Sequence, residues 1–120
     1  MTTGMAMMTI QDVVSALSLQ VAAGDQGLDN KVSGGYASDL LSCVMAGAAE
    51  ANLWVTLQAH PNVVAVADLL NLAGVLITEG AQPDDETVSR ANEKGIPLLL
   101  TSEHTFVIVG KLCQLGISGS

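Results

Sequence analysis

The chain has 120 residues, of which 49% are hydrophobic and only 2% are aromatic. A chain of this size buries roughly two-thirds of the surface that it would expose when unfolded, so we expect one domain with a core of aliphatic side chains. The formal net charge of −8 would repel a phosphate backbone, which excludes a nucleic acid polymer as a partner.

Cysteine spacing and hydropathy indicate the compartment. Cys43 and Cys113 lie too far apart for a paired zinc or redox motif, and we expect them to be small buried hydrophobic residues in a reducing compartment. No uncharged apolar stretch reaches about eighteen residues, and the start MTTGMAMM has no basic residue before an apolar run. The sequence therefore predicts a cytoplasmic protein without a membrane partner.

The first expected element is a short helix that begins after Thr9. Asp12 stands three residues further on, and this pair predicts an N-terminal cap. An edge strand is expected at 19–23, where apolar residues alternate with others. The predicted organisation is a flexible lead-in at 1–8, a single domain at 9–117 and a tail at 118–120.

Two adjacent glycines precede the second expected helix. Gly34 and Gly35 predict a bend or bulge, and they would also allow a ligand or another strand to approach closely. Neither GxGxxG nor a Walker spacing surrounds them, so a phosphate cradle is the weaker interpretation. Asp39 is predicted to cap the helix that follows. The expected buried face of that helix comprises Leu40, Leu41, Val44, Met45 and Ala48.

Three nearly continuous apolar runs follow, at 53–58, 75–79 and 97–102. Central parallel strands that helices cover on both faces have this pattern. Helical patterns at 63–73 and 83–95 separate the runs, as right-handed crossovers require. The predicted fold is therefore α/β, with three α/β/α layers and a mostly parallel central sheet.

Two of the expected helices are unusually apolar. Each of these helices has only two polar side chains, at positions three residues from each other, and the second helix also contains a glycine. We expect a second copy of the chain to cover them in a two-fold homodimer, and the alternative is deeper burial between neighbouring elements. The helices are 63–73, with Asp68 and Asn71, and 106–115, with Lys111 and Gln114.

Polar residues follow the predicted strands at their carboxyl ends, where open parallel sheets bind ligands. These residues and the two glycines form the candidate ligand site. The candidate residues are Gly34, Gly35, Gln58, His60, Asn62, Gly80, Ser102 and His104.

Several of these residues also have a purely structural interpretation. His60 and Asn62 flank a proline before the helix at 63–73, so either residue can cap that helix or support the turn. Together with Asp39, they are expected to shape the central turn. His104 can act in the same way at the start of the last helix.

Catalytic and metal-binding patterns are missing from the sequence. A triad of Ser102, a histidine and Asp68 lacks the GxSxG elbow. The set of His60, His104 and Glu79 follows no known metal-ligand spacing. No P-loop surrounds Gly110 and Lys111. We therefore expect no enzymatic activity, no catalytic residue, no metal and no cofactor.

Five segments, in this order and spacing, resemble the DRTGG domain, and the likeness runs from about residue 9 to 117. The motif that names the family is reduced here to Lys31-Val32-Ser33-Gly34-Gly35, without its Asp and Arg. The matching segments are Gly34-Gly35-Tyr36, Asp39-Leu40-Leu41-Ser42, Trp54-Val55-Thr56, His60-Pro61-Asn62 and Val64-Ala65-Val66-Ala67.

The resemblance implies a fold and a type of function. DRTGG domains resemble the non-catalytic N-terminal domain of HPr kinase/phosphorylase, which implies a three-layer α/β/α fold without that enzyme's P-loop domain. They also occur beside CBS domains in regulated pyrophosphatases, where they resemble regulatory or dimer-forming modules.

The combined prediction is a non-catalytic regulatory or assembly module that acts as a homodimer and binds a partner protein. The alternative is a sensor domain that binds a small anionic metabolite or nucleotide at the carboxyl edge of the parallel strands. Helix N-terminal amides near Asn62 and His104 would then hold the anion.

Overall fold

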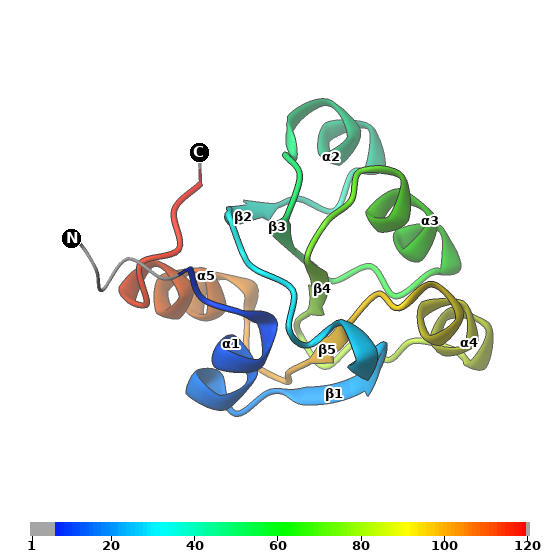
Figure 1. Cartoon of the computed structure of the whole chain (residues 1–120), viewed down its shortest axis with the longest axis horizontal. Helices are drawn as coiled ribbons and strands as arrows, with labels where there is room; N and C mark the ends of the chain where they lie inside the picture. The colour runs from blue at the N-terminus through cyan, green and yellow to red at the C-terminus, as the bar shows by residue number, and fades with distance from the viewer. Residues whose placement is uncertain (1–6, 120) are drawn as a thin grey trace.

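The computed structural model describes residues 7–119, which form a five-stranded sheet with helices on both faces (Figure 1). The strand order is β1-β5-β4-β3-β2. In chain order the elements are α1 (Ile10–Leu17), β1 (Gln20–Ala23), η2 (Asp25–Gly27), β2 (Gly34–Ala37), α2 (Leu41–Gly47), β3 (Asn52–Thr56), α3 (Pro61–Leu69), β4 (Gly74–Ile77), α4 (Asp85–Lys94), β5 (Leu98–Leu100) and α5 (Thr105–Gln114).

The three predicted central strands pair in parallel, as the apolar runs indicated. β3 pairs with β4, and β4 pairs with β5. Every residue of these strands is buried, because helices cover both faces. β2 extends the sheet in parallel at one edge, and β1 closes the other edge as an antiparallel strand. The prediction of a mostly parallel α/β sheet is confirmed.

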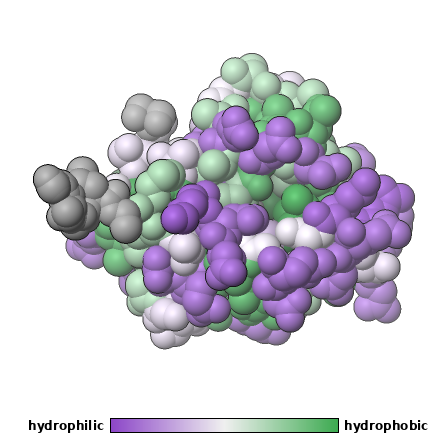
Figure 2. All heavy atoms as spheres, in the orientation of Figure 1, coloured by the Kyte–Doolittle hydropathy of each residue, from purple (hydrophilic) through white to green (hydrophobic). Residues whose placement is uncertain are grey.

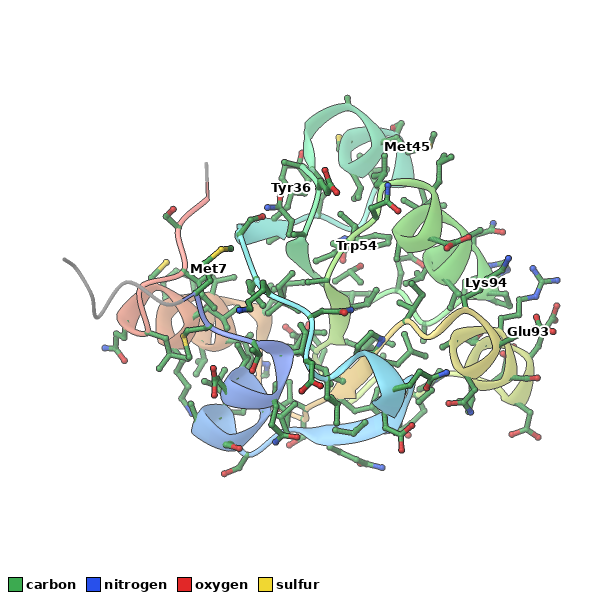
Figure 3. All side chains as sticks on the ribbon, in the orientation of Figure 1. Met7, Tyr36, Met45, Trp54, Glu93 and Lys94 are labelled. Carbon is green, nitrogen blue, oxygen red and sulfur yellow. The ribbon has the colours of Figure 1, made fainter. Side chains whose placement is uncertain are left out.

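The helices form two unequal layers (Figure 1). α2, α3 and α4 cover one face, where Trp54 is fully buried in the core beneath them (Figure 3). α1 and α5 cover the other face and pack over a core that includes Leu53 and Leu76. Each face of the sheet therefore has its own hydrophobic core.

The predicted start of α1 is confirmed in detail. The Thr9 side chain accepts a hydrogen bond from the Asp12 amide, and the Asp12 carboxylate accepts one from the Thr9 amide. This reciprocal capping box satisfies two amides that lack partners inside the helix. The expected edge strand at 19–23 is also present, as β1.

Gly34 and Gly35 form regular strand rather than the bend or bulge that the sequence suggested. They pair in register with Asn52 and Leu53. The Gly35 amide donates to the Ser118 carbonyl at 2.8 Å, and a Cβ at Gly35 would lie 3.4 Å from the Ile117 side chain. That distance is ordinary van der Waals contact, so the hydrogen bond to Ser118 holds the C-terminal segment at the edge of β2.

The two apolar helices differ in how far one copy of the chain covers them. Most of the apolar surface of α3 is covered, because α2 and α4 flank it and its valines face the core (Figure 1). Leu69 at its end is 64% exposed. The apolar composition of α3 therefore reflects burial within one copy of the chain. α5 differs: Phe106 is 89% exposed, and Val107 is also exposed.

α2 also differs from its prediction. Val44 is fully buried, but Leu40 and Met45, expected in the core, are 65% and 50% exposed. The helix has only seven residues and contributes one narrow buried stripe, so these two side chains point into solvent. Figure 2 shows hydrophobic side chains over α2 and hydrophilic ones over α4.

Three further predictions concern cysteines, chain ends and membranes. Cys43 and Cys113 are exposed, not buried as expected. The expected flexible lead-in comprised residues 1–8. Residues 1–6 lie outside the described residues, whereas Met8 is held in place, because its carbonyl accepts a hydrogen bond from the Val32 amide. Among the residues described, no helix has the length and apolar character to cross a membrane.

Candidate functional site

The predicted polar residues after β3, β4 and β5 meet at one edge of the sheet, as parallel pairing requires. Gly34 and Gly35 do not join them, because they lie at the amino end of β2. Two carboxylates that the candidate set omitted, Glu79 and Asp84, are central to this carboxyl edge. The candidates that lie in its loops and turns are Gln58, His60, Asn62, Gly80, Ser102 and His104.

Asp39 connects the loop after β2 to the loop after β3. Its Oδ1 accepts hydrogen bonds from the Thr56 hydroxyl at 2.8 Å and from the Leu57 amide at 2.9 Å. The Gln58 side chain donates to the Asp39 carbonyl at 3.2 Å. Asp39 does not cap α2. The N-cap residue of α2 is Leu40, whose side chain makes no capping hydrogen bond. Its part in shaping the central turn is confirmed, and the predicted cap is wrong.

His60 provides the N-cap of α3. Its Nδ1 accepts a hydrogen bond from the Asn62 amide at 3.2 Å, and Pro61 occupies the first turn. Asn62 is therefore the donor to this cap and not the capping residue. Of the two interpretations that the sequence left open, the structure selects His60.

Asp84 lies close to His60 and caps α4. Its Oδ1 accepts from the Thr87 hydroxyl at 2.7 Å and from the Thr87 amide at 2.8 Å. These two bonds, followed by the positive charge of a protonated His60, hold the pKa of Asp84 below its ordinary value. Because the carboxylate occupies the α4 N-terminus, it already supplies the negative charge that the helix dipole favours there.

The carboxylate of Glu79 caps the N-terminus of α5, although Glu79 itself lies in the loop after β4. Its Oε2 accepts from the Thr105 amide at 2.7 Å, and its Oε1 lies 2.9 Å from His104 Nδ1. The backbone of Glu79 is left-handed, with φ of 64°. Its amide donates to the Glu103 carbonyl at 2.9 Å, which ties the loops after β4 and β5 together.

The electrostatics of the Glu79 and His104 pair follow from these bonds. The Thr105 amide, and then His104, hold the pKa of Glu79 below its ordinary value. The hydrogen bond and the negative charge of Glu79 raise the pKa of His104. The carboxylate and imidazole therefore stabilise each other's charged forms.

Two of the residues considered for a catalytic triad, His104 and Asp68, have other partners in the structure. His104 pairs with Glu79, while Asp68 on α3 lies 3.8 Å from the Lys94 ammonium. Within residues 7–119, no three His, Cys, Asp or Glu side chains are placed to hold a metal ion. The loops of this edge are joined by hydrogen bonds from Asp39 and Glu79.

Comparison with known proteins places this geometry in a family. Residues 38–115 match the DRTGG domain. The chain belongs to the DRTGG domain family. The resemblance in the segments from Asp39 to Ala67 is thereby confirmed, and the match extends to the end of α5. The segment Gly34-Gly35-Tyr36 lies before the matched residues. The sequence matches no curated protein.

A solved structure shares the DRTGG fold of this chain. It contains the CBS and DRTGG domains of the regulatory region of Clostridium perfringens pyrophosphatase, complexed with its activator, diadenosine tetraphosphate. The TM-score is 0.71 at 14% sequence identity, over 88% of this chain and 46% of that one. The present chain thus spans less than half of that regulatory region.

Proposed function

We propose that this DRTGG domain is a non-catalytic regulatory module that acts as a homodimer and binds a partner protein. One observation carries the proposal: the carboxylates of Asp39, Glu79 and Asp84 at the polar edge already accept hydrogen bonds within the chain, whereas large apolar side chains face solvent on α2 and α5. Leu40, Met45 and Phe106 are all at least half exposed. Exposed apolar surface favours association, while the carboxylates of the edge are already engaged in caps and turns.

The known setting of the family supports a regulatory role. The pyrophosphatase that contains a similarly folded DRTGG domain has it in a regulatory region. Fold and family membership do not determine a reaction. The structural roles of the two histidines are consistent with a non-catalytic module, because His60 caps a helix and His104 is paired with Glu79.

Light scattering after size-exclusion chromatography tests the homodimer. The protomer has a mass of 12.3 kDa, so the proposal expects twice that mass at micromolar concentration. A single-protomer mass would contradict the homodimer. The control is the same measurement in high salt, where a contact formed by apolar surface should persist because screening weakens only charge interactions.

The second candidate function is a sensor of a small anionic metabolite or nucleotide at the carboxyl edge. The nucleotide activator in the pyrophosphatase complex motivates it. At α3 the N-terminal amides face a histidine cap, whereas carboxylates occupy the N-termini of α4 and α5. An anion near His60 and Asn62 would therefore meet no capping carboxylate at the helix N-terminus itself, although the carboxylate of Asp84 lies close by.

A thermal-shift screen tests the sensor. Diadenosine tetraphosphate, ATP and AMP are the probes, and a ligand at a hundred times its Kd should add roughly 2.7 kcal/mol to the free energy of unfolding. His60→Ala should abolish the response, and Lys31→Ala, at the opposite edge, should not. If no probe moves the melting temperature, the sensor function is excluded for these nucleotides and the binding module remains.

A further inference from the structure

The edge strand β2 contributes little side-chain volume to the face of the sheet that α5 covers. Gly35 and Ala37 stand on that face, because they pair in register with two residues of β3 that face α5. Those two residues are Leu53 and Val55, which are buried in the core beneath α1 and α5. At the same level of the sheet, Gly35 and Ala37 supply only a hydrogen atom and a methyl group. The layer between β2 and α5 is therefore short of side-chain atoms.

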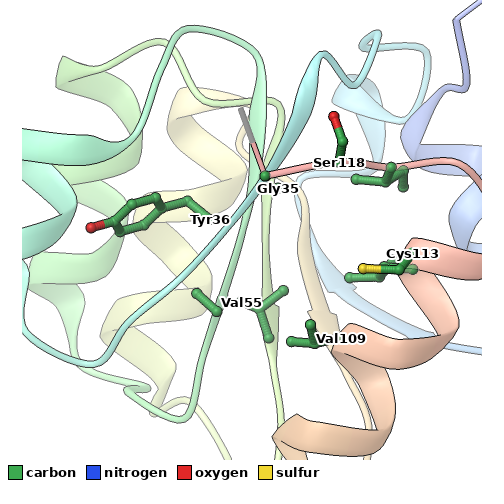
Figure 4. Close-up of a pocket in the computed structure, with 10 residues that line it drawn as sticks. Gly35, Tyr36, Val55, Val109, Cys113 and Ser118 are labelled. Carbon is green, nitrogen blue, oxygen red and sulfur yellow. The ribbon is translucent and has the colours of Figure 1, made fainter.

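An apolar cavity of about 280 Å³ lies at this place, between β2 and α5 (Figure 4). Val55 lines it from the sheet, and Val109 and Cys113 line it from the helix. The Tyr36 side chain points away from it (Figure 4). The C-terminal segment forms a third wall, in which Ile117 is buried. Three separate parts of the chain therefore meet around one apolar space.

The backbone of Ala37 borders the cavity at the edge of the sheet. The Gly35 amide points away from β3, since it donates to the Ser118 carbonyl at 2.8 Å. Ala37 stands two residues further along the strand, so its amide and carbonyl point in the same direction. Among residues 7–119, neither group has a backbone partner outside the sheet. Because Ala37 also lines the cavity, it offers one hydrogen-bond donor and one acceptor at the rim.

The charge of the walls determines which kind of ligand the cavity accepts. Among the residues described, none that lines it carries a charged side chain. An ion that entered the cavity would lose hydration without gaining a counter-charge, which costs far more free energy than the burial of a neutral group. The net charge of −8 also repels anions. The cavity therefore favours an uncharged ligand, in contrast to the anions considered for the carboxyl edge.

The volume of the cavity limits the size of the ligand. An apolar cavity of about 150 Å³ is large enough to bind benzene, and pockets for drug-sized molecules begin at about 300 Å³. The present cavity, at about 280 Å³, lies between these sizes. It has room for one aromatic ring with a short substituent, or for two fused rings.

We propose that the cavity between β2 and α5 binds a small, uncharged, apolar molecule of one or two rings, whose single polar group hydrogen-bonds to the backbone of Ala37. This site is separate from the carboxyl edge, and the inference does not depend on the proposed homodimer. The bound molecule contacts β2, α5 and the C-terminal segment together. Binding therefore also holds the hydrogen bond between Gly35 and Ser118 closed.

An NMR titration of the full chain tests the site, with indole and benzyl alcohol as the uncharged probes. Each probe should shift the amide signals of Gly35, Ala37 and Cys113 and should reach saturation at millimolar or lower concentration. Hydrogen exchange at the Gly35 amide should become slower, because its bond to Ser118 opens less often. Benzoate and benzylammonium keep the ring of benzyl alcohol but carry a charge, so they should bind at least about tenfold more weakly.

Two variants that fill the cavity locate the bound probe. Val109→Trp fills it from the helix and Ala37→Leu from the strand, so each should weaken indole binding at least about tenfold. Leu69→Trp is the matched control, because it adds the same side chain at an exposed position on α3 and should leave indole binding unchanged.

Three results would overturn the inference. They are the absence of a saturable shift with both uncharged probes, unchanged binding in both filled variants, and binding of benzoate or benzylammonium as tight as that of benzyl alcohol. Circular dichroism establishes that each variant is folded, and Ala37→Leu alone decides the location if Val109→Trp unfolds, because Ala37 is exposed and tolerates a larger side chain.

Discussion

Glu79 and His104 join the ends of two neighbouring parallel strands through an ion pair of 2.9 Å. The same carboxylate accepts the Thr105 amide at 2.7 Å, so one side chain connects two loops and caps α5. Its left-handed backbone, with φ of 64°, turns the carboxylate towards the helix. The start of the helix that carries Phe106 is therefore fixed by a residue 26 positions earlier.

The pair predicts a defined pH dependence of stability. The pKa of Glu79 lies below 4.5, so its contribution is present above pH 4.5 and is lost as the pH falls through that lowered pKa. The pKa of His104 lies above 6.5, so its contribution is present below pH 6.5 and is lost as the pH rises through that raised pKa. The pair should stabilise the fold most between these two values.

An NMR titration of His104 checks this coupling. Glu79→Gln should bring the pKa of His104 back towards 6.5, because the variant lacks the negative charge. Glu103→Gln is the control, since that carboxylate pairs with Lys111 and should leave the titration of His104 unchanged. An identical His104 titration in wild type and Glu79→Gln would contradict the ion pair.

A second prediction concerns the Asp39 bridge. Asp39→Ala should lower the free energy of unfolding by about 1–3 kcal/mol, because the Leu57 amide and the buried Thr56 hydroxyl lose their acceptor. A double-mutant cycle with Thr56→Val, measured by urea unfolding, should give a coupling of about 1 kcal/mol. Glu50→Ala, at an exposed acid, is the control. Purely additive effects would show that the two side chains act independently.

Much of the polar edge could be predicted from the sequence, because its position depends on patterns among residues that are close together in the chain. Apolar runs mark β3, β4 and β5, and parallel pairing then brings their carboxyl ends together whatever the details of the loops. The capping box at Thr9 and Asp12 was predictable for the same reason, because it uses residues three apart. Patterns of short range therefore gave the fold class and the position of the polar edge.

Two errors concern distant partners. Asp39 looked like a helix cap from its neighbours, but its acceptor role depends on Thr56 in another strand. Gly34 and Gly35 looked like a bend, but they stay extended because β3 and the C-terminal segment pair with them. Such information is absent from any single window of sequence.

A third prediction compares two glycines with similar backbones. Gly24 and Gly80 have φ of 71° and 74°. A Cβ at Gly80 would meet nothing within 4 Å, whereas at Gly24 it would overlap the Ile96 carbonyl and lie 2.6 Å from the Pro97 nitrogen. Gly80→Ala should therefore cost only about 1–2 kcal/mol of left-handed strain, and Gly24→Ala should cost more. Equal urea midpoints for the two variants would be inconsistent with this packing.

The last prediction separates the structural role of His60 from a ligand-binding one. His60 Nδ1 accepts the Asn62 amide at 3.2 Å, so His60→Ala should lose about 0.5–2 kcal/mol of stability through the missing cap. His60→Asn should retain most of it, because Asn is among the best N-cap residues. Chemical denaturation of the three proteins measures both effects.

The stability order decides what the imidazole contributes. Wild type and His60→Asn above His60→Ala would establish a cap that another residue can replace. Equal stability of wild type and His60→Ala would mean that the cap contributes nothing to the fold, which leaves the imidazole available for a ligand. Because His60→Asn keeps the cap and removes the ring, a nucleotide response in the thermal-shift screen that survives His60→Asn but not His60→Ala would come from the ordered α3 N-terminus.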